Sequence, residues 1–207
     1  MSDDQTIAVY HTRAAGYASL EISPVQVRAL ERFTAALPNA SFVLDLGCGP
    51  GIHARAIMEA GHEVDAIDAT QAFVDTAIAH GVTARLATFD EITSVDTYDG
   101  IWASFSLLHA PRAKVPGYLA ALAQALKPNG ILFLGMKTGE GEERDKFGRH
   151  YCYFTVEELS AMLIDLDLTV THREDGEEAG FAGTVDPFTM LHAQFRTGTH
   201  PKAQKHA

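Results

Sequence analysis

The sequence predicts an α/β protein with a doubly wound, mostly parallel sheet and helices on both faces. Short apolar runs alternate with segments of helical periodicity along most of the chain. The first run, SFVLDL at residues 41–46, is nearly continuous, which is typical of a strand buried on both faces. The chain has 207 residues, of which 46% are hydrophobic, and is long enough to bury one sizeable core.

The first half of the chain supplies three predicted strands. Residues 24–37 carry apolar side chains at helical spacing behind Pro24, a residue that suits a first helical turn. Gly61 and Gly81 each end a helical segment, as glycine often does. The predicted strands cover residues 41–46, 63–68 and 84–88, and the helices between them cover residues 52–60 and 69–80.

The second half continues this alternation and then ends in a hairpin. Thr155, with Glu158 three residues later, forms a capping-box pattern that begins a helix. Residues 175–187 are too few and too glycine-rich for a crossover helix, so the last two strands are predicted to pair antiparallel. The predicted strands cover residues 98–104, 131–137, 168–174 and 188–196, and a further helix covers residues 113–126.

The composition excludes several classes of partner. The formal net charge is −11, so we expect no DNA and no membrane partner, and the charge also argues against RNA. Cys48 and Cys152 lie far apart without metal-type spacing, so no metal site is predicted. The first residues are acidic where a secretion signal is basic, and no long apolar run follows, so we expect a cytoplasmic protein. A small-molecule substrate remains allowed, and the oligomeric state stays open.

Three glycines fall within five positions in the segment VLDLGCGPGIHA, residues 43–54. Because glycine has no Cβ, Gly47, Gly49 and Gly51 let the backbone turn sharply and approach a ligand closely. Parallel sheets bind ligands beyond the carboxyl ends of their strands, where this loop lies. The helix that follows presents unpaired N–H groups at its start. We therefore expect a ligand-binding loop.

Three ligand chemistries compete for this loop. A phosphate-binding loop needs Gly-Lys-Ser/Thr, whereas Ile52 and His53 follow the last glycine. A dinucleotide fold prefers G-x-G-x-x-G, but Ile52 stands at the place of the third glycine, and the chain lacks the Tyr-x-x-x-Lys pair of short-chain dehydrogenases. The third ligand carries an adenosine and an amino acid instead of phosphates. Asp45 favours this ligand, because a carboxylate attracts an ammonium and repels a pyrophosphate.

The segment VLDLGCGPG resembles motif I of class I S-adenosylmethionine (SAM)-dependent methyltransferases, and the order of later landmarks fits that family over about residues 42–195. The resemblance implies a Rossmann-like sheet of seven strands with an antiparallel last strand, SAM as cofactor, and methyl transfer to a small molecule. We expect one domain over residues 1–197, with an N-terminal helical cap segment over residues 1–38 and an active-site loop over residues 138–154. Residues 198–207 are expected to form a loose tail.

The resemblance carries the family's cofactor positions onto this chain. Asp45 would anchor the SAM ammonium, and Asp68, in AIDAT, would accept both ribose hydroxyls. Asp90 would take the adenine amino group, although Asp68 and Asp90 also suit helix caps. Cys48 is expected to act as a small packing residue rather than a nucleophile. The implied cofactor-binding residues are Asp45, Gly47, Cys48, Gly49, Gly51, Asp68, Ala69, Phe89, Asp90, Ser104 and Phe105, with Thr70 and Phe73 also near the adenine.

The acceptor is less well defined. Residues 104–112, SFSLLHAPR, lack the Asn/Asp-Pro-Pro-Tyr/Phe sequence of methyltransferases that act on amino groups of nucleic-acid bases or glutamine. The SLLH run resembles small-molecule methyltransferases of the tellurite- or metalloid-resistance-like type. His109 is a candidate catalytic base because its ordinary pKa lies near neutrality, and the alternative is a helix-entry residue bonded to backbone. Methyl transfer also depends on in-line positioning, so a dedicated base can be absent.

Two further segments are predicted to complete the substrate pocket. Lys137 precedes the polar active-site loop, and the loop itself contains Arg144, Lys146, Arg149 and Tyr151, so these side chains can gather around an anionic acceptor. The acidic residues of that loop make a solvated, flexible lid the default interpretation, and the anion site is the alternative. Tyr10 and Tyr17 precede the predicted sheet, and in related enzymes such a segment folds over the cofactor; a packing role is the alternative.

The sequence therefore predicts a SAM-dependent methyltransferase for a small-molecule acceptor. The second hypothesis is a non-catalytic SAM-binding or partner-activating subunit, which requires Phe105, Leu108 or Tyr17 to fill the space beside the methyl group. A nicotinamide-dependent oxidoreductase is a distant third. The sequence does not define the acceptor or its reacting atom, which can be oxygen, nitrogen, sulfur or a metalloid.

Overall fold

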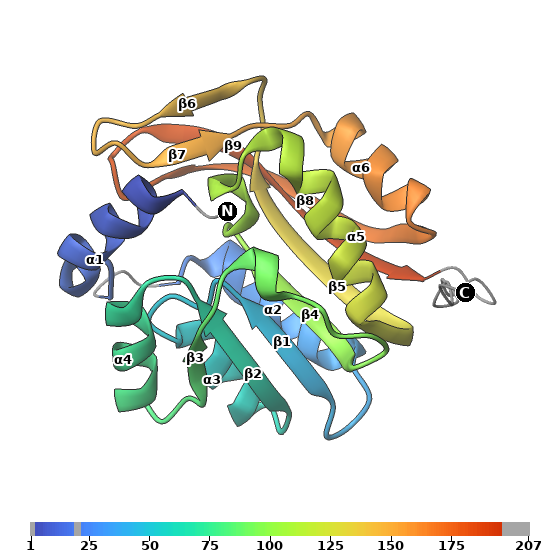
Figure 1. The fold of residues 1–207 in the computed structure, drawn as a ribbon. Coiled ribbons are helices and arrows are strands. Elements are labelled where there is room, and N and C mark those ends of the chain that lie inside the picture. The colour runs from blue at the N-terminus through green and yellow to red at the C-terminus, as the bar shows by residue number, and fades with distance from the viewer. Residues whose placement is uncertain (1–2, 19–21, 196–207) are drawn as a thin grey trace, which may run out of the picture.

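The computed structural model describes residues 3–18 and 22–195, which form a sheet of seven strands with helices on both faces (Figure 1). The strand order is β3-β2-β1-β4-β5-β9-β8. The first five strands of this order run parallel, and β9 runs antiparallel to both β5 and β8. This arrangement confirms the predicted fold class. The strands are β1 (Phe42–Leu46), β2 (Glu63–Asp68), β3 (Ala84–Leu86), β4 (Tyr98–Ser104), β5 (Leu126–Lys137), β8 (Leu168–Ala179) and β9 (Val185–Phe195).

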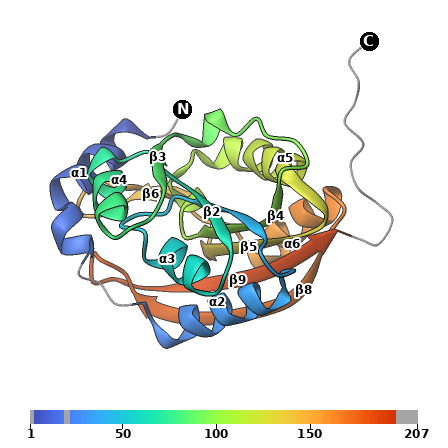
Figure 2. The same ribbon diagram turned by 90° about the horizontal axis from the view of Figure 1, so that it is seen from below.

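The helices alternate with the strands as the sequence predicts. Helices α2 and α3 pack on one face of the sheet and α5 and α6 on the other, while α4 lies beside β2 and β3 (Figure 2). The helices are α1 (Asp4–Ala18), α2 (Pro24–Ala36), α3 (Ile52–Glu59), α4 (Gln71–Ala79), α5 (Val115–Ala125) and α6 (Val156–Asp165), with short 3₁₀ turns η1 (Phe89–Glu91), η2 (Leu107–His109) and η3 (Arg112–Lys114).

Two aromatic rings stack at the centre of the sheet. Trp102 of β4 and Phe133 of β5 are fully buried, and their rings lie 3.6 Å apart with an interplanar angle of 9°. Both belong to the core under α2 and α3, whereas the adjacent Ile101 and Leu132 belong to the core under α5 and α6. This alternation is the period of two that a strand buried on both faces must have.

The strand order reverses beside β1, which pairs with β2 on one side and with β4 on the other. A crevice forms at such a point, beyond the carboxyl ends of the strands. The glycine loop, residues 47–51, leaves β1 there. The carboxyl ends of β2, β4 and β5 lie at the same edge of the sheet, so the segments that follow these three strands surround the loop.

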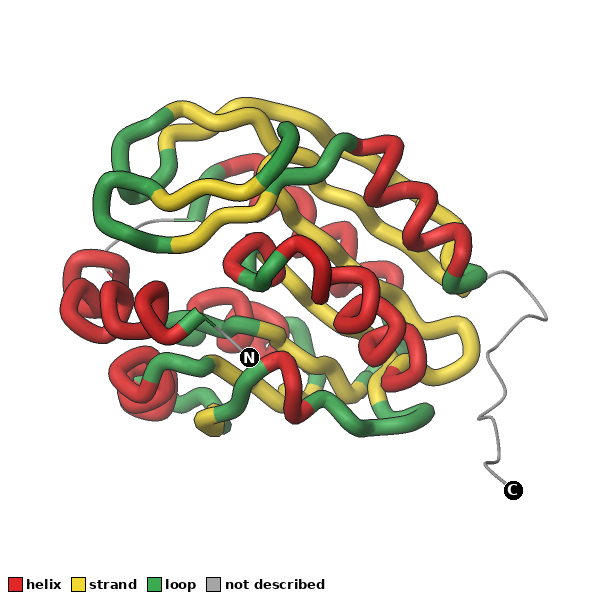
Figure 3. The backbone as a smooth tube through the Cα atoms, turned by 45° about the horizontal axis from the view of Figure 1, so that its top comes forward, coloured by secondary structure: helices red, strands yellow, loops and turns green. Residues whose placement is uncertain are grey.

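The predicted active-site loop contains a second, small sheet. Strand β6 (Glu142–Arg144) pairs antiparallel with β7 (His150–Cys152), and Figure 3 shows this hairpin on the same side of the molecule as α1. The carboxylate of Asp145 holds the turn, because its Oδ1 accepts hydrogen bonds from the amides of Phe147 and Arg149, each at 2.9 Å. The segment is therefore a structured hairpin held at its turn by Asp145, while Glu140, Glu142 and Glu143 are exposed to solvent.

The N-terminal cap segment contains α1 and α2, and α1 is bonded to the hairpin. Asp3 caps α1 by accepting a hydrogen bond from the amide of Thr6 at 2.8 Å. Arg144 of β6 donates to both oxygens of Asp3, and the amide of His150 of β7 donates to Thr6 Oγ1 at 2.8 Å. These bonds join segments that lie about 140 residues apart in the sequence.

A few boundaries differ from the predictions. Strand β5 begins at Leu126 rather than at residue 131, because Leu126 pairs with Tyr98 ahead of a register shift. Residue 196 and the predicted tail over residues 198–207 lie outside the described residues, and the assignment of one domain stays a prediction. Within residues 3–18 and 22–195, each helix is too short or too polar to cross a bilayer.

We expect Phe133→Ala to lower the free energy of unfolding by about 3–5 kcal/mol, because the change leaves a cavity under Trp102. The free energy is measured by urea denaturation. Ile164→Ala is the control, since this α6 side chain is 48% exposed, and its effect should stay within about 0.5 kcal/mol. Equal effects of the two changes would contradict the assignment of Phe133 to the centre of the core.

Candidate functional site

Two adjoining cavities open at the carboxyl edge of the sheet. The large cavity has a volume of about 250 Å³ and extends to the end of β5 and the tip of the β8–β9 hairpin. The small cavity has a volume of about 90 Å³ and extends to the turn between β2 and α4. The two cavities share a common wall, formed by Tyr10, Tyr17, Gly47, Gly49, Ser104, Phe105 and His109.

Most of the predicted site residues line these cavities. The whole common wall was predicted from the sequence. The small cavity is also lined by Asp68, Ala69, Thr70, Phe73 and Phe89. The large cavity is also lined by Cys48, Lys137, Arg149 and Tyr151. Three predicted cofactor residues line neither cavity, namely Asp45, Gly51 and Asp90.

The glycine loop is fixed by packing as well as by its backbone angles. Gly47 has φ of 74°, and a Cβ there would lie 2.4 Å from the Cβ of Ser106. Gly51 has φ of 84°, and its Cβ would lie 2.8 Å from the Cβ of Ala77. The amide of Gly47 also donates to the carbonyl of Ile67 in β2 at 2.8 Å. Gly51 is thus required by the close approach of α4, and Gly47 by the close approach of the segment after β4.

Asp68 joins the glycine loop to the turn that begins α4. Its Oδ2 accepts a hydrogen bond from the amide of Gly49 at 2.9 Å, and its Oδ1 accepts one from the amide of Thr70 at 2.8 Å. Burial raises the pKa of Asp68, and these amides oppose the rise. The residue at the N-cap of α4 is Thr70, so Asp68 is not that cap. The Thr70 hydroxyl and the Ala69 amide also interact with this carboxylate, which lines the small cavity.

Asp45 is a buried acid without a counter-charge. Its side chain is 1% exposed, and its Oδ2 has no hydrogen-bond partner among the described residues. Burial, reinforced by the negative charge of Asp68, raises the pKa of Asp45 to about 8, although the Ala54 amide opposes the rise. A cation near the glycine loop would favour the ionised form of Asp45 and so lower this pKa.

Asp90 is the middle residue of η1 and lines neither cavity. Its Oδ1 accepts a hydrogen bond from the hydroxyl of Tyr118 at 2.9 Å and lies 3.6 Å from Lys114 Nζ. The ring of the preceding Phe89 lines the small cavity and packs edge-on against Tyr118. The predicted contact between Asp90 and adenine therefore stays a prediction, whereas Phe89 lies where an adenine ring can pack.

Both ring nitrogens of His109 are engaged. Nδ1 lies 2.6 Å from the carbonyl oxygen of His150, which can only accept, so Nδ1 carries the proton. Nε2 then accepts from the hydroxyl of Tyr10 at 2.7 Å. Burial lowers the pKa of His109 to about 3, so the imidazole is neutral. A substrate proton can reach His109 only through Tyr10 or after Tyr10 moves, and the role of His109 as a base stays a prediction.

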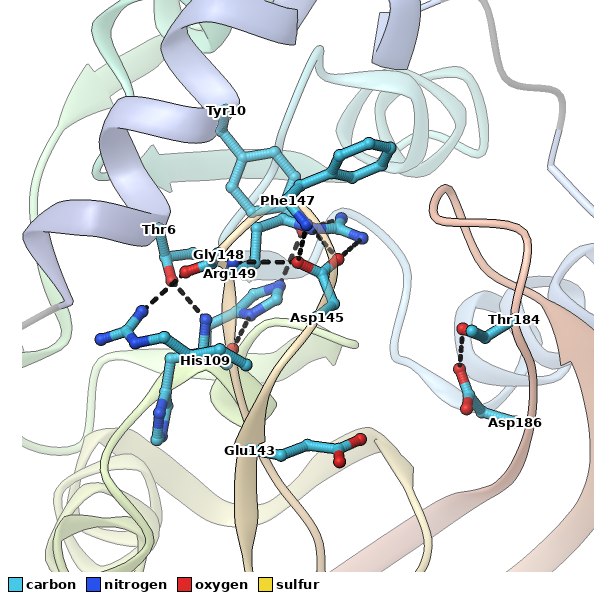
Figure 4. Close-up of polar contacts among 12 residues, drawn as sticks. Thr6, Tyr10, His109, Glu143, Asp145, Phe147, Gly148, Arg149, Thr184 and Asp186 are labelled. Atoms are coloured by element: carbon cyan, nitrogen blue, oxygen red, sulfur yellow. Dashed lines mark hydrogen bonds and ion pairs between the residues drawn. The ribbon is translucent and has the colours of Figure 1, made fainter.

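Arg149 lies beneath Tyr10 and has its own acid partner (Figure 4). Its Nε and Nη2 donate to Asp145 Oδ2 at 2.8 and 2.6 Å, and its Nη1 donates to the hydroxyl of Tyr10 at 3.0 Å. The side chain is 3% exposed. Four rings surround its guanidinium at 5.2–5.9 Å, those of Tyr10, Phe147, Tyr151 and Phe181.

Lys137 also has an acid partner at the wall of the large cavity. Its Nζ donates to Asp186 Oδ2 at 2.5 Å and lies 4.3 Å from the centre of the Tyr151 ring. Lys137 and Arg149 are therefore neutralised in place, which argues against the predicted site for an anionic acceptor. In residues 3–18 and 22–195, no group of three or more His, Cys, Asp or Glu side chains is placed to hold a metal ion.

Sequence reasoning missed the aromatic tip of the β8–β9 hairpin. Phe181 contacts the ring of Tyr17 at 5.7 Å, and Phe188 contacts that of Phe105 at 5.7 Å and 90°. Both residues line the large cavity. The signal was present in the segment GFAGTVDPF, because a hairpin that pairs antiparallel with β5 must bring its tip to the ligand edge. His53, at the start of α3, lines this cavity and was also missed.

Comparisons with known proteins agree with the class that the fold and the site indicate. Residues 43–130 match the model of a family described as a methyltransferase domain. The ubiquinone biosynthesis O-methyltransferase of Rickettsia canadensis is 30% identical over 122 residues, covering 55% of this chain and 51% of that protein. The cypemycin N-terminal methyltransferase of a Streptomyces species is 35% identical over 99 residues, covering 44% of this chain and 40% of that protein. The matched part of the chain thus spans about half the length of these curated relatives, or less.

A solved structure shows the same fold. The 1,6-didemethyltoxoflavin-N1-methyltransferase of Burkholderia thailandensis has a TM-score of 0.74 and 22% identity, covering 93% of this chain and 86% of that chain. That crystal contains 1,6-didemethyltoxoflavin and S-adenosylhomocysteine. The likeness establishes that this chain has the Rossmann-like fold of the class I methyltransferases. The comparisons do not single out the tellurite-resistance-like branch.

Tyr10→Phe should loosen α1, because it removes the hydroxyl that bonds to His109 and Arg149. A buried hydrogen bond to a charged group contributes about 1.5–3 kcal/mol, so hydrogen exchange of the α1 amides should become roughly tenfold faster or more. The measurement is hydrogen exchange followed by mass spectrometry. Thr12→Val is the control, since the exposed Thr12 hydroxyl bonds only within α1. Unchanged exchange in Tyr10→Phe would show that these hydrogen bonds do not hold α1.

Asp45 should make stability fall as pH rises. Its folded pKa of about 8 lies above its ordinary value of 3.8, so between these values the native state keeps a proton that the unfolded chain has lost. The free energy of unfolding then falls by up to about 1.4 kcal/mol per pH unit from pH 4 to pH 8, and this contribution is flat outside that range.

Asp45→Asn should abolish this dependence of the free energy of unfolding on pH. Urea denaturation of both proteins from pH 5 to pH 9 should show the variant gaining stability relative to the wild type up to about pH 8. Asp75→Asn, at an exposed position of α4, is the matched control and should give a constant difference. A difference between Asp45→Asn and the wild type that does not change with pH would overturn the assignment.

Proposed function

We propose that this protein is a SAM-dependent methyltransferase that acts on a small molecule. The observation that carries the proposal is the common wall of the two cavities, which lies beside the glycine loop. The adenosine of SAM occupies the small cavity, the acceptor occupies the large cavity, and the reacting atoms meet at the common wall. The family match over residues 43–130 and the shared fold support this cofactor.

The residues present fit SAM by their chemistry. The carboxylate of Asp68, which lines the small cavity, would accept the ribose hydroxyls, and the rings of Phe73 and Phe89 would flank the adenine. Asp45 has a buried oxygen without a partner, and the ammonium of SAM supplies the missing positive charge nearby. Gly47 has no side chain, since a Cβ there would collide with Ser106, and its bare backbone therefore forms part of the cavity wall. The predicted adenine contact of Asp90 remains part of the proposal.

Catalysis in this proposal depends chiefly on positioning. Bound SAM supplies an electrophilic methyl group on a sulfonium. The wall residues Tyr10, Tyr17 and Phe105 exclude water and direct the acceptor along the line of attack. An acceptor proton passes to bulk water or, through the hydroxyl of Tyr10, to Nε2 of His109. The low pKa of His109 makes the first of these routes the easier one.

The volume of the large cavity favours an enzyme over a non-catalytic subunit. The alternative requires Phe105, Leu108 or Tyr17 to fill the space beside the methyl group, yet these side chains line a cavity of about 250 Å³. The relatives named above act on different acceptors, so the acceptor of this chain does not follow from them. A closer relation to tellurite-resistance-like enzymes, a cytoplasmic location, and the absence of DNA and RNA partners stay predictions.

Isothermal titration with SAM and with S-adenosylhomocysteine tests the proposal. Both should bind, and Asp68→Asn should weaken binding by about tenfold or more, since it removes charged acceptors of hydrogen bonds. Asp65→Asn is the matched control on the same strand, because Asp65 bonds to Arg85 and Tyr98 and lines neither cavity. Absence of binding at millimolar concentrations would reject the proposal.

A further inference from the structure

We propose that the large cavity selects a planar aromatic or heteroaromatic acceptor, and that the ring of Phe105 is the surface on which the acceptor stacks. This inference rests on the proposed methyltransferase function and narrows its substrate class. Two independent observations carry it, namely the rings that line the cavity and the backbone conformation that holds Phe105 in place.

The walls of the large cavity are unusually rich in rings. One group of rings comes from α1 and the tip of the β8–β9 hairpin, where Tyr17 contacts both Tyr10 and Phe181. A second group comes from the ends of β4 and β9, where Phe105 contacts Phe188. Among the described residues no ring contact joins the two groups, although all of these residues line one cavity. The cavity is therefore lined by two separate groups of rings, and each offers an aromatic surface to a flat ring bound there.

Phe105 is held in a costly conformation. Its φ is 53°, in the left-handed region that a bulky side chain rarely adopts. Strain of this kind persists only where the surrounding structure fixes it, and it gathers at functional sites. Phe105 is half-buried and lines both cavities, so the strained residue stands at the point where methyl donor and acceptor meet.

Two neighbours hold the Phe105 ring in place. A Cβ at Gly135 of β5 would lie 3.3 Å from Cε2 of Phe105, so the ring rests on a position without a side chain. The amide of Phe105 donates to the carbonyl of Gly135 at 3.0 Å. The ring of Phe188 in β9 lies at 90° to it, with the two ring centres 5.7 Å apart. The Phe105 ring is thus fixed by Phe188 and by Gly135, and its position at the cavity wall is set before an acceptor binds.

The polar groups of the cavity suit substituents on such a ring. The ammonium of Lys137 and the carboxylate of Asp186 form a neutral pair at the wall, over the ring of Tyr151. An uncharged hydroxyl, carbonyl or ring nitrogen can bond to this pair without adding net charge. A strongly anionic acceptor without a ring would find Lys137 and Arg149 already paired with acids and would make no use of the aromatic walls.

Binding of paired fragments, measured by ligand-observed NMR with S-adenosylhomocysteine at saturation, tests the inference. Each pair joins a flat ring to its saturated counterpart: catechol with cis-cyclohexane-1,2-diol, 3,4-dihydroxybenzoate with its cyclohexane analogue, and 2-pyridone with 2-piperidone. The aromatic members should bind, and their saturated counterparts should bind at least several-fold more weakly.

Two variants locate the stacking surface. Phe105→Leu should reduce the preference for the aromatic members by about two- to tenfold, the usual contribution of an aromatic pair. Gly135→Ala, which displaces the ring, should reduce it in the same direction. Phe42→Leu is the matched control, because Phe42 packs on Tyr98 and lines neither cavity. Circular dichroism confirms that each variant is folded, and the wild-type preference tests the substrate class even if a variant does not fold.

The outcomes separate this inference from the proposed function. If S-adenosylhomocysteine does not bind to the wild type, the proposed function fails, and this inference fails with it. If S-adenosylhomocysteine binds but the saturated fragments bind as well as the aromatic ones, only the aromatic acceptor class is overturned. If the preference is present but Phe105→Leu leaves it unchanged, the assignment of Phe105 as the stacking surface is overturned.

Discussion

The site depends on the carboxylate of Asp68, which accepts hydrogen bonds from the amides of Gly49 and Thr70. These two bonds connect the glycine loop after β1 with the turn after β2, and they set the spacing of the crevice between them. Loops without such a partner would leave buried amides unsatisfied, which costs more free energy than the bonds themselves contribute. The common wall of the two cavities keeps its shape because the loop beside it is held on this carboxylate.

The charges around the loop point to the same kind of ligand. Asp45 and Asp68 are buried near each other, and the negative charge of Asp68 contributes to the raised pKa of Asp45. The basic residues of the large cavity are already paired, Lys137 with Asp186 and Arg149 with Asp145. The loop region is therefore short of positive charge, which disfavours a phosphate and favours a ligand that brings an ammonium and a sulfonium. This explains why the glycine loop has no lysine.

The positions of the strands along the chain and the glycine loop could be predicted from the sequence because they depend on local patterns. Apolar runs, glycines and a capping box are each readable within a dozen residues. The individual contacts that cover the site could not be predicted, because they join distant segments, such as the bond of Tyr10 to His109 and the packing of Phe181 on Tyr17. Arg149 resembled a ligand for an anion because its partner Asp145, four residues away, was counted as part of a solvated lid.

The tip of the β8–β9 hairpin is a place where the sequence of this protein can vary in evolution. Its two strands are anchored in the sheet along most of their length, while its tip contributes Phe181 to the cavity wall. The residues that would hold the nucleoside come instead from the strand ends around β1 and β2. Substitutions or length changes at the hairpin tip can thus reshape the large cavity, and they meet the small cavity through the contact of Phe181 with Tyr17 rather than at Asp68. Evolution or protein engineering can therefore change the substrate by altering the tip of the β8–β9 hairpin, because removal of the tip leaves the central strands paired.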